Sequence, residues 1–190
     1  CAHGLGYTRM DSRYRDVETS ALYYVPLDAE HEVWRLTVTN RDARPRRLSA
    51  FGYCELTTDS DCEQDTVNLQ YTQFITRTEY RDGFLLQHIN ESCGADENGE
   101  NGRERVFGLA GAKVCSYTGR RERFLGLGRF CAPDGVRAGR LDDSLNFNGN
   151  PCGALHTAFA LQPGESVTLA FVLAQKGASG ARALLERYQS

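Results

Sequence analysis

Alternation of apolar and polar residues with a period of two restricts the fold class of this chain more than any other feature. In the segment HEVWRLTVTN, Trp34, Leu36 and Val38 fall on one side, and the residues between them are polar. The segment SVTLAFVLA at 166–174 repeats the pattern. This period is that of a strand with one face on a core. The chain is therefore predicted to consist mainly of half-buried β-strands.

Turn residues between these runs predict two hairpins. The turn RDARPRR separates HEVWRLTVTN from LSAFGYCEL, and RDG at 81–83 separates YTQFITRTEY from FLLQHINES. Pro, Asp and Gly are the residues that such turns favour. The opening segment CAHGLGYTRM is interpreted as a Gly-punctuated loop followed by a strand. Its Gly4-Leu5-Gly6 lacks the Lys and the helix of a phosphate loop, so a structural turn is expected there.

Only the end of the chain has a helical pattern. Four residues follow the spacing i, i+3, i+4, i+7 of one helix face: Ala181, Leu184, Leu185 and Tyr188. Ser179 is the candidate N-cap. The predicted fold class is all-β, an antiparallel β-sandwich over residues 1–176, and residues 177–190 are the start of a linker helix.

The charge balance argues against nucleic acid and membrane partners. Lys and Arg number 22 against 25 Asp and Glu, a net charge of −3, whereas nucleic-acid binding needs a basic stripe or patch. Two short basic clusters, at 44–47 and 120–123, are interpreted as solvated turns. No apolar run approaches the roughly 18 residues of a membrane-spanning helix.

Cysteine and histidine spacing predicts no metal site. The seven cysteines are irregularly spaced and form no CxxC pair. They are interpreted as free, mostly buried thiols of a cytoplasmic protein. No metal-ligand spacing links the histidines, which are His3, His31, His88 and His156.

Acidic residues give no catalytic pair. Asp142-Asp143 and Asp59-Ser60-Asp61 are neighbours in loops, which does not place two carboxyl groups about 5–10 Å apart across a sugar. They are interpreted as turn or cap residues. In NLQYTQF, by contrast, Asn68, Gln70 and Tyr71 are amide and aromatic groups, which fit either a sugar site or strand packing.

Five blocks in a fixed order resemble the N-terminal β-sandwich domain of the inverting phosphorylases of glycoside hydrolase family 94. They are CAHGLGYTRM, VETSALYYVPLD, EVWRLTVTN, RPRRLSAFGYCEL and LQPGESVTLAFVLAQ. The family includes cellobiose, cellodextrin and chitobiose phosphorylases. The segments NLQYTQFITRTEY, FGLAGAKV and LNFNGNPCGALHT look most like cellodextrin phosphorylase. Tyr71 stands where cellobiose phosphorylases tend to have Arg.

The resemblance implies a supersandwich of the galactose-mutarotase type that belongs to a longer enzyme. Linker helices and an (α/α)6 barrel would follow, and the barrel would hold the catalytic Asp and the phosphate pocket. No catalytic residue is therefore assigned here. The implied reaction is reversible phosphorolysis of β-1,4-gluco-oligosaccharides with inversion to α-glucose 1-phosphate. Inorganic phosphate is a co-substrate, no metal or organic cofactor is expected, and the enzyme is expected to be a cytoplasmic homodimer.

The resemblance also implies sugar contacts. The position after the N-x-Q triplet is carried over as an acceptor contact, which gives Tyr71, with Gln70 beside it and Asn68 as support. Weaker candidates lie in an Asn-rich loop: Asn146, Asn148 and Asn150. The alternatives are a cellobiose phosphorylase, a free-standing carbohydrate-binding sandwich and a purely structural dimerisation domain. The apolar-face position of Trp34, the single Trp, disfavours the free-standing module.

Overall fold

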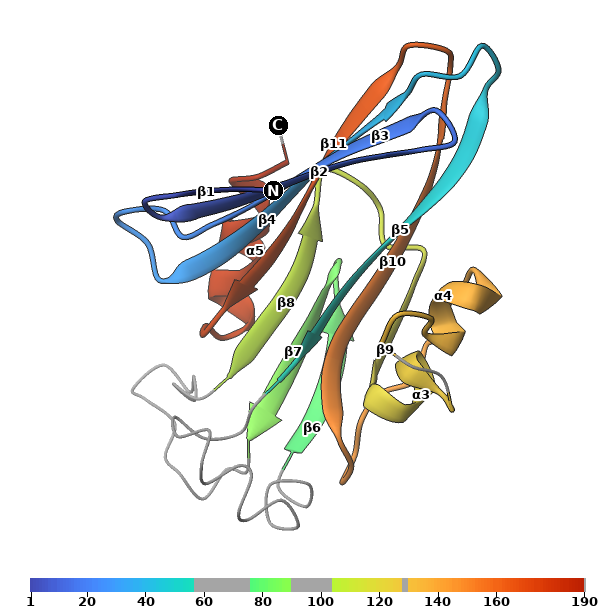
Figure 1. The fold of residues 1–190 in the computed structure, drawn as a ribbon. Coiled ribbons are helices and arrows are strands. Elements are labelled where there is room, and N and C mark those ends of the chain that lie inside the picture. Colours follow the sequence, from blue (N-terminus) through green and yellow to red (C-terminus); the bar gives the residue numbers. More distant parts are fainter. Residues whose placement is uncertain (57–75, 90–103, 128–129, 190) are drawn as a thin grey trace.

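Two antiparallel sheets form the layers of the computed structural model, which describes residues 1–56, 76–89, 104–127 and 130–189 (Figure 1). The larger sheet consists of β1 (Ala2–Gly4), β2 (Tyr7–Tyr14), β3 (Val17–Tyr24), β4 (His31–Asn40), β6 (Thr76–Arg81), β7 (Phe84–Ile89), β8 (Arg105–Ala110) and β11 (Ser166–Ala174). Its order is β1-β2-β3-β4-β11-β8-β7-β6. The smaller sheet, in the order β5-β10-β9, consists of β5 (Arg46–Glu55), β10 (Pro151–Leu161) and β9 (Ser116–Arg120). The predicted all-β, antiparallel sandwich is confirmed.

One predicted hairpin is confirmed and the other is wrong. β6 pairs with β7 across Asp82 and Gly83, whose φ angles of 41° and 94° suit a tight two-residue turn. β4, however, pairs with β3 and β11, whereas β5 pairs with β10 in the other sheet. The side-chain amide of Asn40 fixes this corner, because it donates to the carbonyl oxygens of Arg44 at 2.9 Å and Leu161 at 3.1 Å.

The start of the chain is a hairpin rather than a loop that leads into a strand. Ala2–Gly4 pairs with Tyr7–Arg9, and Gly6 has a φ of 85° in the connecting turn. Glycine adopts this left-handed conformation at little cost. The interpretation of Gly4-Leu5-Gly6 as a structural turn is confirmed.

The core between the sheets contains the side chains that the alternation placed inward. Its buried members are Ala50, Cys54, Leu56, Leu85, Phe107, Leu109, Val114, Leu155, Leu169 and Phe171. Trp34 and Leu36 pack against this cluster as partly buried residues, and so do Val167 and Leu173 of β11. The predicted apolar faces of β4 and β11 therefore both face the smaller sheet.

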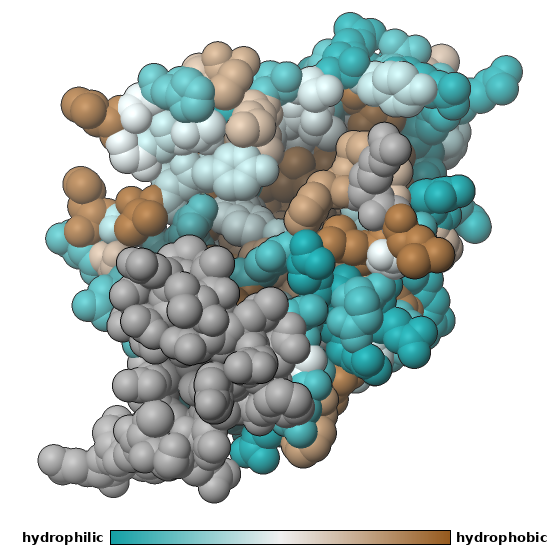
Figure 2. All heavy atoms as spheres, turned by 60° about the horizontal axis from the view of Figure 1, so that its bottom comes forward, coloured by the Kyte–Doolittle hydropathy of each residue, from teal (hydrophilic) through white to brown (hydrophobic). Residues whose placement is uncertain are grey.

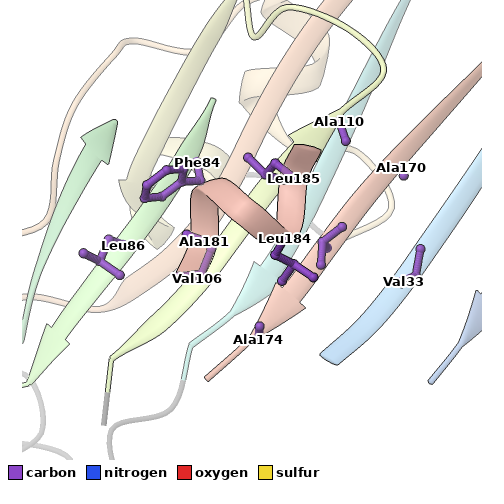
Figure 3. Packing of buried hydrophobic residues seen from close by; sticks show 11 residues of the cluster. Val33, Phe84, Leu86, Val106, Ala110, Ala170, Ala174, Ala181, Leu184 and Leu185 are labelled. Carbon is purple, nitrogen blue, oxygen red and sulfur yellow. The ribbon is translucent and has the colours of Figure 1, made fainter. Parts of the chain in front are cut away.

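Helix α5 (Ala178–Glu186) covers the opposite face of the larger sheet (Figure 3). Its buried residues Ala181, Leu184 and Leu185 pack with Phe84, Val106 and other strand residues, so the predicted helix face is confirmed. The residue that precedes the helix is Gly177, and no side chain caps it. The prediction of Ser179 as N-cap is therefore wrong, because Ser179 lies inside the first turn. The role of α5 as a linker stays a prediction.

Two short helices were not predicted. α3 (Arg121–Leu125) and α4 (Asp134–Ala138) follow β9 and have five residues each. Phe124 and Leu125 pack into a small third core on the smaller sheet. The basic cluster at 120–123 is thus the end of β9 and the start of α3, and its interpretation as a turn is wrong.

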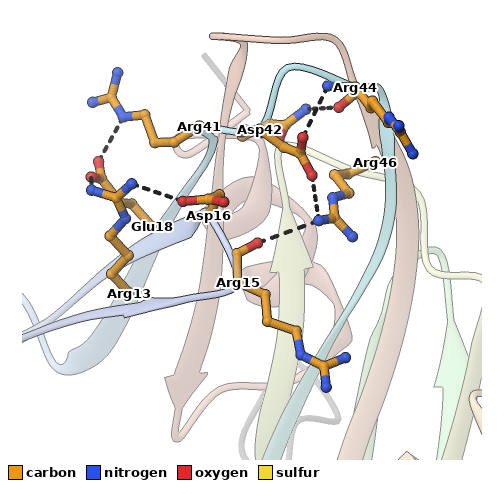
Figure 4. Close-up of polar contacts among 9 residues, drawn as sticks. Arg13, Arg15, Asp16, Glu18, Arg41, Asp42, Arg44 and Arg46 are labelled. Atoms are coloured by element: carbon orange, nitrogen blue, oxygen red, sulfur yellow. Dashed lines mark hydrogen bonds and ion pairs between the residues drawn. The ribbon is translucent and has the colours of Figure 1, made fainter.

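The other basic cluster lies at the corner between β4 and the start of β5, where one of its arginines pairs with an acid (Figure 4). Arg46 forms an ion pair with Asp42. On the neighbouring turn, Glu18 accepts a hydrogen bond from Arg41 at 2.7 Å and lies 3.6 Å from Arg13. These ion pairs tie the turn between β2 and β3 together and fix Arg46 at the start of β5.

Candidate functional site

The candidate site is the end of the sandwich that lies on either side of the segment with the predicted sugar contacts in the sequence. β5 ends at Glu55, and β6 and β10 begin at Thr76 and Pro151, at the bottom of Figure 1. Asn68, Gln70 and Tyr71 lie between Leu56 and Thr76, outside the described residues, so their role as acceptor contacts stays a prediction. Figure 2 brings this end forward and shows apolar side chains among hydrophilic ones.

The loop of residues 146–150 is fixed against the start of β6. The backbone N–H of Asn146 donates to Oγ1 of Thr78 at 2.7 Å, and its side-chain amide donates to Oγ1 of Thr76 at 3.3 Å. The backbone N–H of Asn148 donates to the carbonyl oxygen of Thr76 at 3.2 Å. Because Asn146 is only 2% exposed, it shapes the loop and does not reach a ligand, so its prediction as a sugar contact is wrong.

The same loop presents other groups to solvent. Asn148 is exposed, with a φ of 56° that Asn tolerates better than most residues. Phe147 is 75% exposed, and its backbone forms an isolated bridge with Arg77. The carbonyl oxygen of Asn150 accepts a hydrogen bond from the backbone N–H of Arg121 at 3.0 Å. The side chain of Asn148 is thus accessible, and the roles of Asn148 and Asn150 as sugar contacts stay predictions.

A hydrogen-bonded cluster of an aromatic residue, an acid and a base lies beside this loop. Oε1 of Glu55 accepts hydrogen bonds from the hydroxyl of Tyr53 at 2.9 Å and from Nε of Arg121 at 2.8 Å. The Tyr53 ring stacks on Phe124 with centroids 4.3 Å apart, and the Arg121 guanidinium lies 5.5 Å from the ring centroid of Phe130. Burial, followed by the bond to Glu55, raises the pKa of Tyr53. The phenol is therefore a neutral hydrogen-bond donor.

The sequence prediction missed Phe147, Glu55 and Arg121. One signal could have indicated Phe147, because the segment LNFNGNP places an apolar residue between two Asn in a stretch without alternation. Such a residue has no core face and is expected to be exposed. No comparable signal joins Glu55 to Arg121, which are 66 positions apart in sequence.

The adjacent acids Asp142 and Asp143 are occupied in a turn, as predicted. Oδ1 of Asp142 accepts hydrogen bonds from the hydroxyl of Ser144 at 2.7 Å and from its backbone N–H at 3.3 Å. Asp143 accepts from the backbone N–H of Tyr117 at 3.1 Å and from Arg140 at 2.8 Å. Burial raises the pKa of Asp142, but hydrogen bonds from Ser144, Thr118 and the backbone together outweigh it, so the pKa lies below its ordinary value. A general acid needs the opposite shift.

The described histidines are held by neighbouring side chains. Nε2 of His31 lies 2.7 Å from the hydroxyl of Tyr188, and Nδ1 of His156 lies 2.9 Å from the hydroxyl of Ser116. His88 lies within 3.0 Å of two glutamates. Within the described ranges, no group of three or more His, Cys, Asp or Glu could hold a metal ion.

Five cysteines can be placed, and all five are free. Cys54 and Cys152 are buried, and burial raises the pKa of Cys54 to about 12, so its thiol is unreactive at neutral pH. The exposed members are Cys1, Cys115 and Cys131. The prediction of mostly buried thiols is therefore wrong for the part of the chain that the structure describes. Cys62 and Cys93 lie outside it. No helix in that part is both long and apolar enough to cross a membrane.

Comparison with solved structures agrees with the fold. A polysaccharide lyase matches with a TM-score of 0.52 and 14% sequence identity, over 95% of this chain and 23% of the lyase. At this identity the match bears on the fold alone.

Comparison with protein sequences gives the family. The description "Glycosyl hydrolase 94, supersandwich domain" matches residues 1–190. The N,N'-diacetylchitobiose phosphorylase of Vibrio furnissii is 33% identical over 188 residues, 98% of this chain and 22% of that protein. The solabiose phosphorylase of Paenibacillus borealis is 28% identical over 172 residues, 88% of this chain and 21% of that protein.

The chain thus spans about a fifth of the length of these relatives. Neither of them is a cellodextrin phosphorylase, so the cellodextrin subfamily stays a prediction, while the family itself is confirmed. The chain belongs to the supersandwich-domain family of glycosyl hydrolase family 94.

Proposed function

We propose that this chain is the non-catalytic N-terminal portion of an inverting phosphorylase that acts on β-linked gluco-oligosaccharides. The observation that carries the proposal is the match of residues 1–190 to a domain of relatives about five times as long, two of which are named as phosphorylases. In this view residues 1–176 are the sandwich and residues 177–190 begin the connection to a catalytic barrel. The isolated chain would be inactive.

The proposed reaction exchanges a glycosidic bond for a phosphate ester. A phosphate oxygen attacks the anomeric carbon from the side opposite the leaving sugar, and the bond from that carbon to the glycosidic oxygen breaks. A carboxylic acid outside this chain gives its proton to the leaving oxygen. The β-linkage thereby becomes an α-sugar 1-phosphate, without a second carboxylate base and without a metal or organic cofactor. A cytoplasmic homodimer is part of the same proposal.

The sugar class has three candidates within this proposal. The segment that holds Asn68, Gln70 and Tyr71 favours cellodextrin, because an aromatic ring at Tyr71 would stack on an additional glucose unit of a longer acceptor. The 33% identity to a diacetylchitobiose phosphorylase supports an N-acetylglucosamine-containing substrate instead. A cellobiose phosphorylase is the third possibility, disfavoured by Tyr71 in place of Arg.

A synthesis assay on the longer protein that contains this chain tests the proposal. α-Glucose 1-phosphate or α-N-acetylglucosamine 1-phosphate is supplied with glucose, cellobiose or N-acetylglucosamine, and phosphate release is followed. Release with cellobiose but little with glucose supports the cellodextrin assignment. Release that requires the N-acetylated donor assigns chitobiose. No release with any pair would overturn the enzymatic proposal.

A single substitution separates a sugar contact from a purely structural role. Tyr71→Ala is expected to raise KM for the longer acceptor while KM for phosphate stays unchanged. Tyr71→Phe keeps the ring and serves as the matched control. An acceptor KM unchanged in Tyr71→Ala would leave only the structural or dimerisation role for this segment.

A further inference from the structure

Two phenylalanine rings are held in solvent at the end of the sandwich described above. Phe147 is 75% exposed and Phe130 is 66% exposed. Phe147 belongs to a loop that is fixed by its backbone bridge to Arg77, and Phe130 lies beneath the guanidinium of Arg121. Each ring therefore has one defined neighbouring contact and is not buried by the fold.

Polar groups connect the two rings. The hydrogen bond from the backbone of Arg121 to Asn150 joins the start of α3 to the loop that carries Phe147. The side chains of Arg121 and Glu55 remain 37% and 47% exposed while they pair with each other. Asn148 adds an exposed amide. Donors and acceptors therefore lie beside both rings.

The arginines at the end of β9 and in α3 each lie close to an acid. Arg121 pairs with Glu55 at 2.8 Å and Arg120 pairs with Glu122 at 2.6 Å. Arg123 lies 3.6 Å from an oxygen of Asp142. A phosphate or a nucleic acid would require an excess of positive charge, so the surface suits an uncharged ligand.

We propose that this aromatic strip, defined as Phe147, Asn148, Glu55, Arg121 and Phe130, binds a neutral β-1,4-linked oligosaccharide. The C–H faces of pyranose rings are flat and apolar and stack on aromatic rings, and their hydroxyls need the paired donors and acceptors that an Arg–Glu pair and an amide supply. The choice of sugar rests on the proposed function, whereas the strip itself rests on the geometry.

Titration calorimetry tests the strip in the whole protein that contains this chain. The probes are cellotetraose and tetra-N-acetylchitotetraose. Phe147→Ala and Phe130→Ala are each expected to weaken binding of one of these sugars about fivefold, the change for losing one aromatic contact. Phe147→Tyr keeps the ring and should bind as the parent protein does. Tyr14→Ala, which removes a ring that is 70% exposed on β2, is the matched control and should change nothing.

The outcomes separate the strip from the proposed enzyme. If the parent protein shows no phosphorolysis but binds the saccharide, and Phe147→Ala weakens that binding, the strip is supported and only the enzymatic proposal is refuted. Equal affinity in the parent protein and both Ala variants, or an equal loss in Tyr14→Ala, overturns the strip. A change of oligomeric state in the Ala variants without a change in saccharide affinity would assign the rings to a protein contact and also overturn it.

Discussion

Helix α5 meets the larger sheet at one contact that allows no additional atom. A Cβ added to Gly108 of β8 would lie 2.7 Å from Cδ2 and 3.1 Å from Cδ1 of Leu185. Carbon atoms in favourable contact are about 3.5–4.0 Å apart. Gly108→Ala should therefore displace Leu185 and loosen α5, whereas the same methyl group would be harmless if Leu185 were small.

The magnitudes follow from this geometry. Overpacking at Gly108→Ala is expected to cost about 1–3 kcal/mol. Leu185→Ala removes a side chain that is 4% exposed, at a cost of about 2–5 kcal/mol. In the double variant the added methyl group occupies space that Leu185 has vacated. The combined cost should thus fall at least about 1 kcal/mol below the sum of the single costs.

Hydrogen–deuterium exchange of the α5 amides, followed by mass spectrometry, measures these costs locally, since each loss of about 1.4 kcal/mol accelerates exchange tenfold. Gly108→Ala with Leu184→Ala is the matched control and should be additive, because Leu184 is not among the nearest atoms to Gly108. Additive costs for Gly108→Ala and Leu185→Ala, or unchanged exchange in Gly108→Ala alone, would refute the reasoning.

Three further predictions concern stability and self-association. Burial, reinforced by nearby Arg187 and Lys176, lowers the pKa of His31 below 6.5 in the folded state. The stabilising contribution of neutral His31 should therefore be complete above pH 6.5 and should be lost as the pH falls below it. Thermal melting of the parent protein and of His31→Gln from about pH 8 to pH 5 should give melting temperatures that converge at the acidic end. Asn146→Ala should lower the free energy of unfolding by about 1–3 kcal/mol, because it removes a buried hydrogen-bonding amide. Asn148→Ala, at an exposed position, should cost less, and an equal cost for the two variants in thermal unfolding would contradict the assigned roles. The isolated chain is expected to self-associate. Tyr14→Lys, which places a charge at an exposed ring of β2, should shift the chain toward monomer in analytical ultracentrifugation. An unchanged distribution of oligomers would argue against a contact through Tyr14.

The part of the fold that could be predicted from sequence is the part decided by local spacing. The period of two identified β4 and β11, the turn at Asp82 and Gly83 joined β6 to β7, and the spacing of 3.6 identified the buried face of α5. In each case the residues that decide the structure lie within about one element of each other.

The parts that were missed depend on contacts between distant residues. Asn40 sends β4 and β5 into different sheets through a bond to Leu161, which is 121 positions away. α3 and α4 are too short to show a helical period and are held by packing of Phe124 and Leu125. At the site, Asn146 and Asn148 are the same residue type two positions apart, and only burial separates the structural side chain from the accessible one.

The pKa shifts of the described acids and thiols decide which of these groups could act as a general acid. The described carboxyl groups with a shifted pKa are all shifted downward, toward the charged form: Asp11, Asp42, Glu79 and Asp142. A general acid at neutral pH needs a carboxyl shifted upward, and the buried thiols of Cys54 and Cys152 remain protonated. None of these four carboxyl groups therefore has the shift that a general acid at neutral pH needs. If the aromatic strip binds saccharides as proposed, Phe147→Ala and Phe130→Ala should change saccharide affinity and leave the pH dependence of the reaction unchanged, because a phenylalanine ring does not titrate.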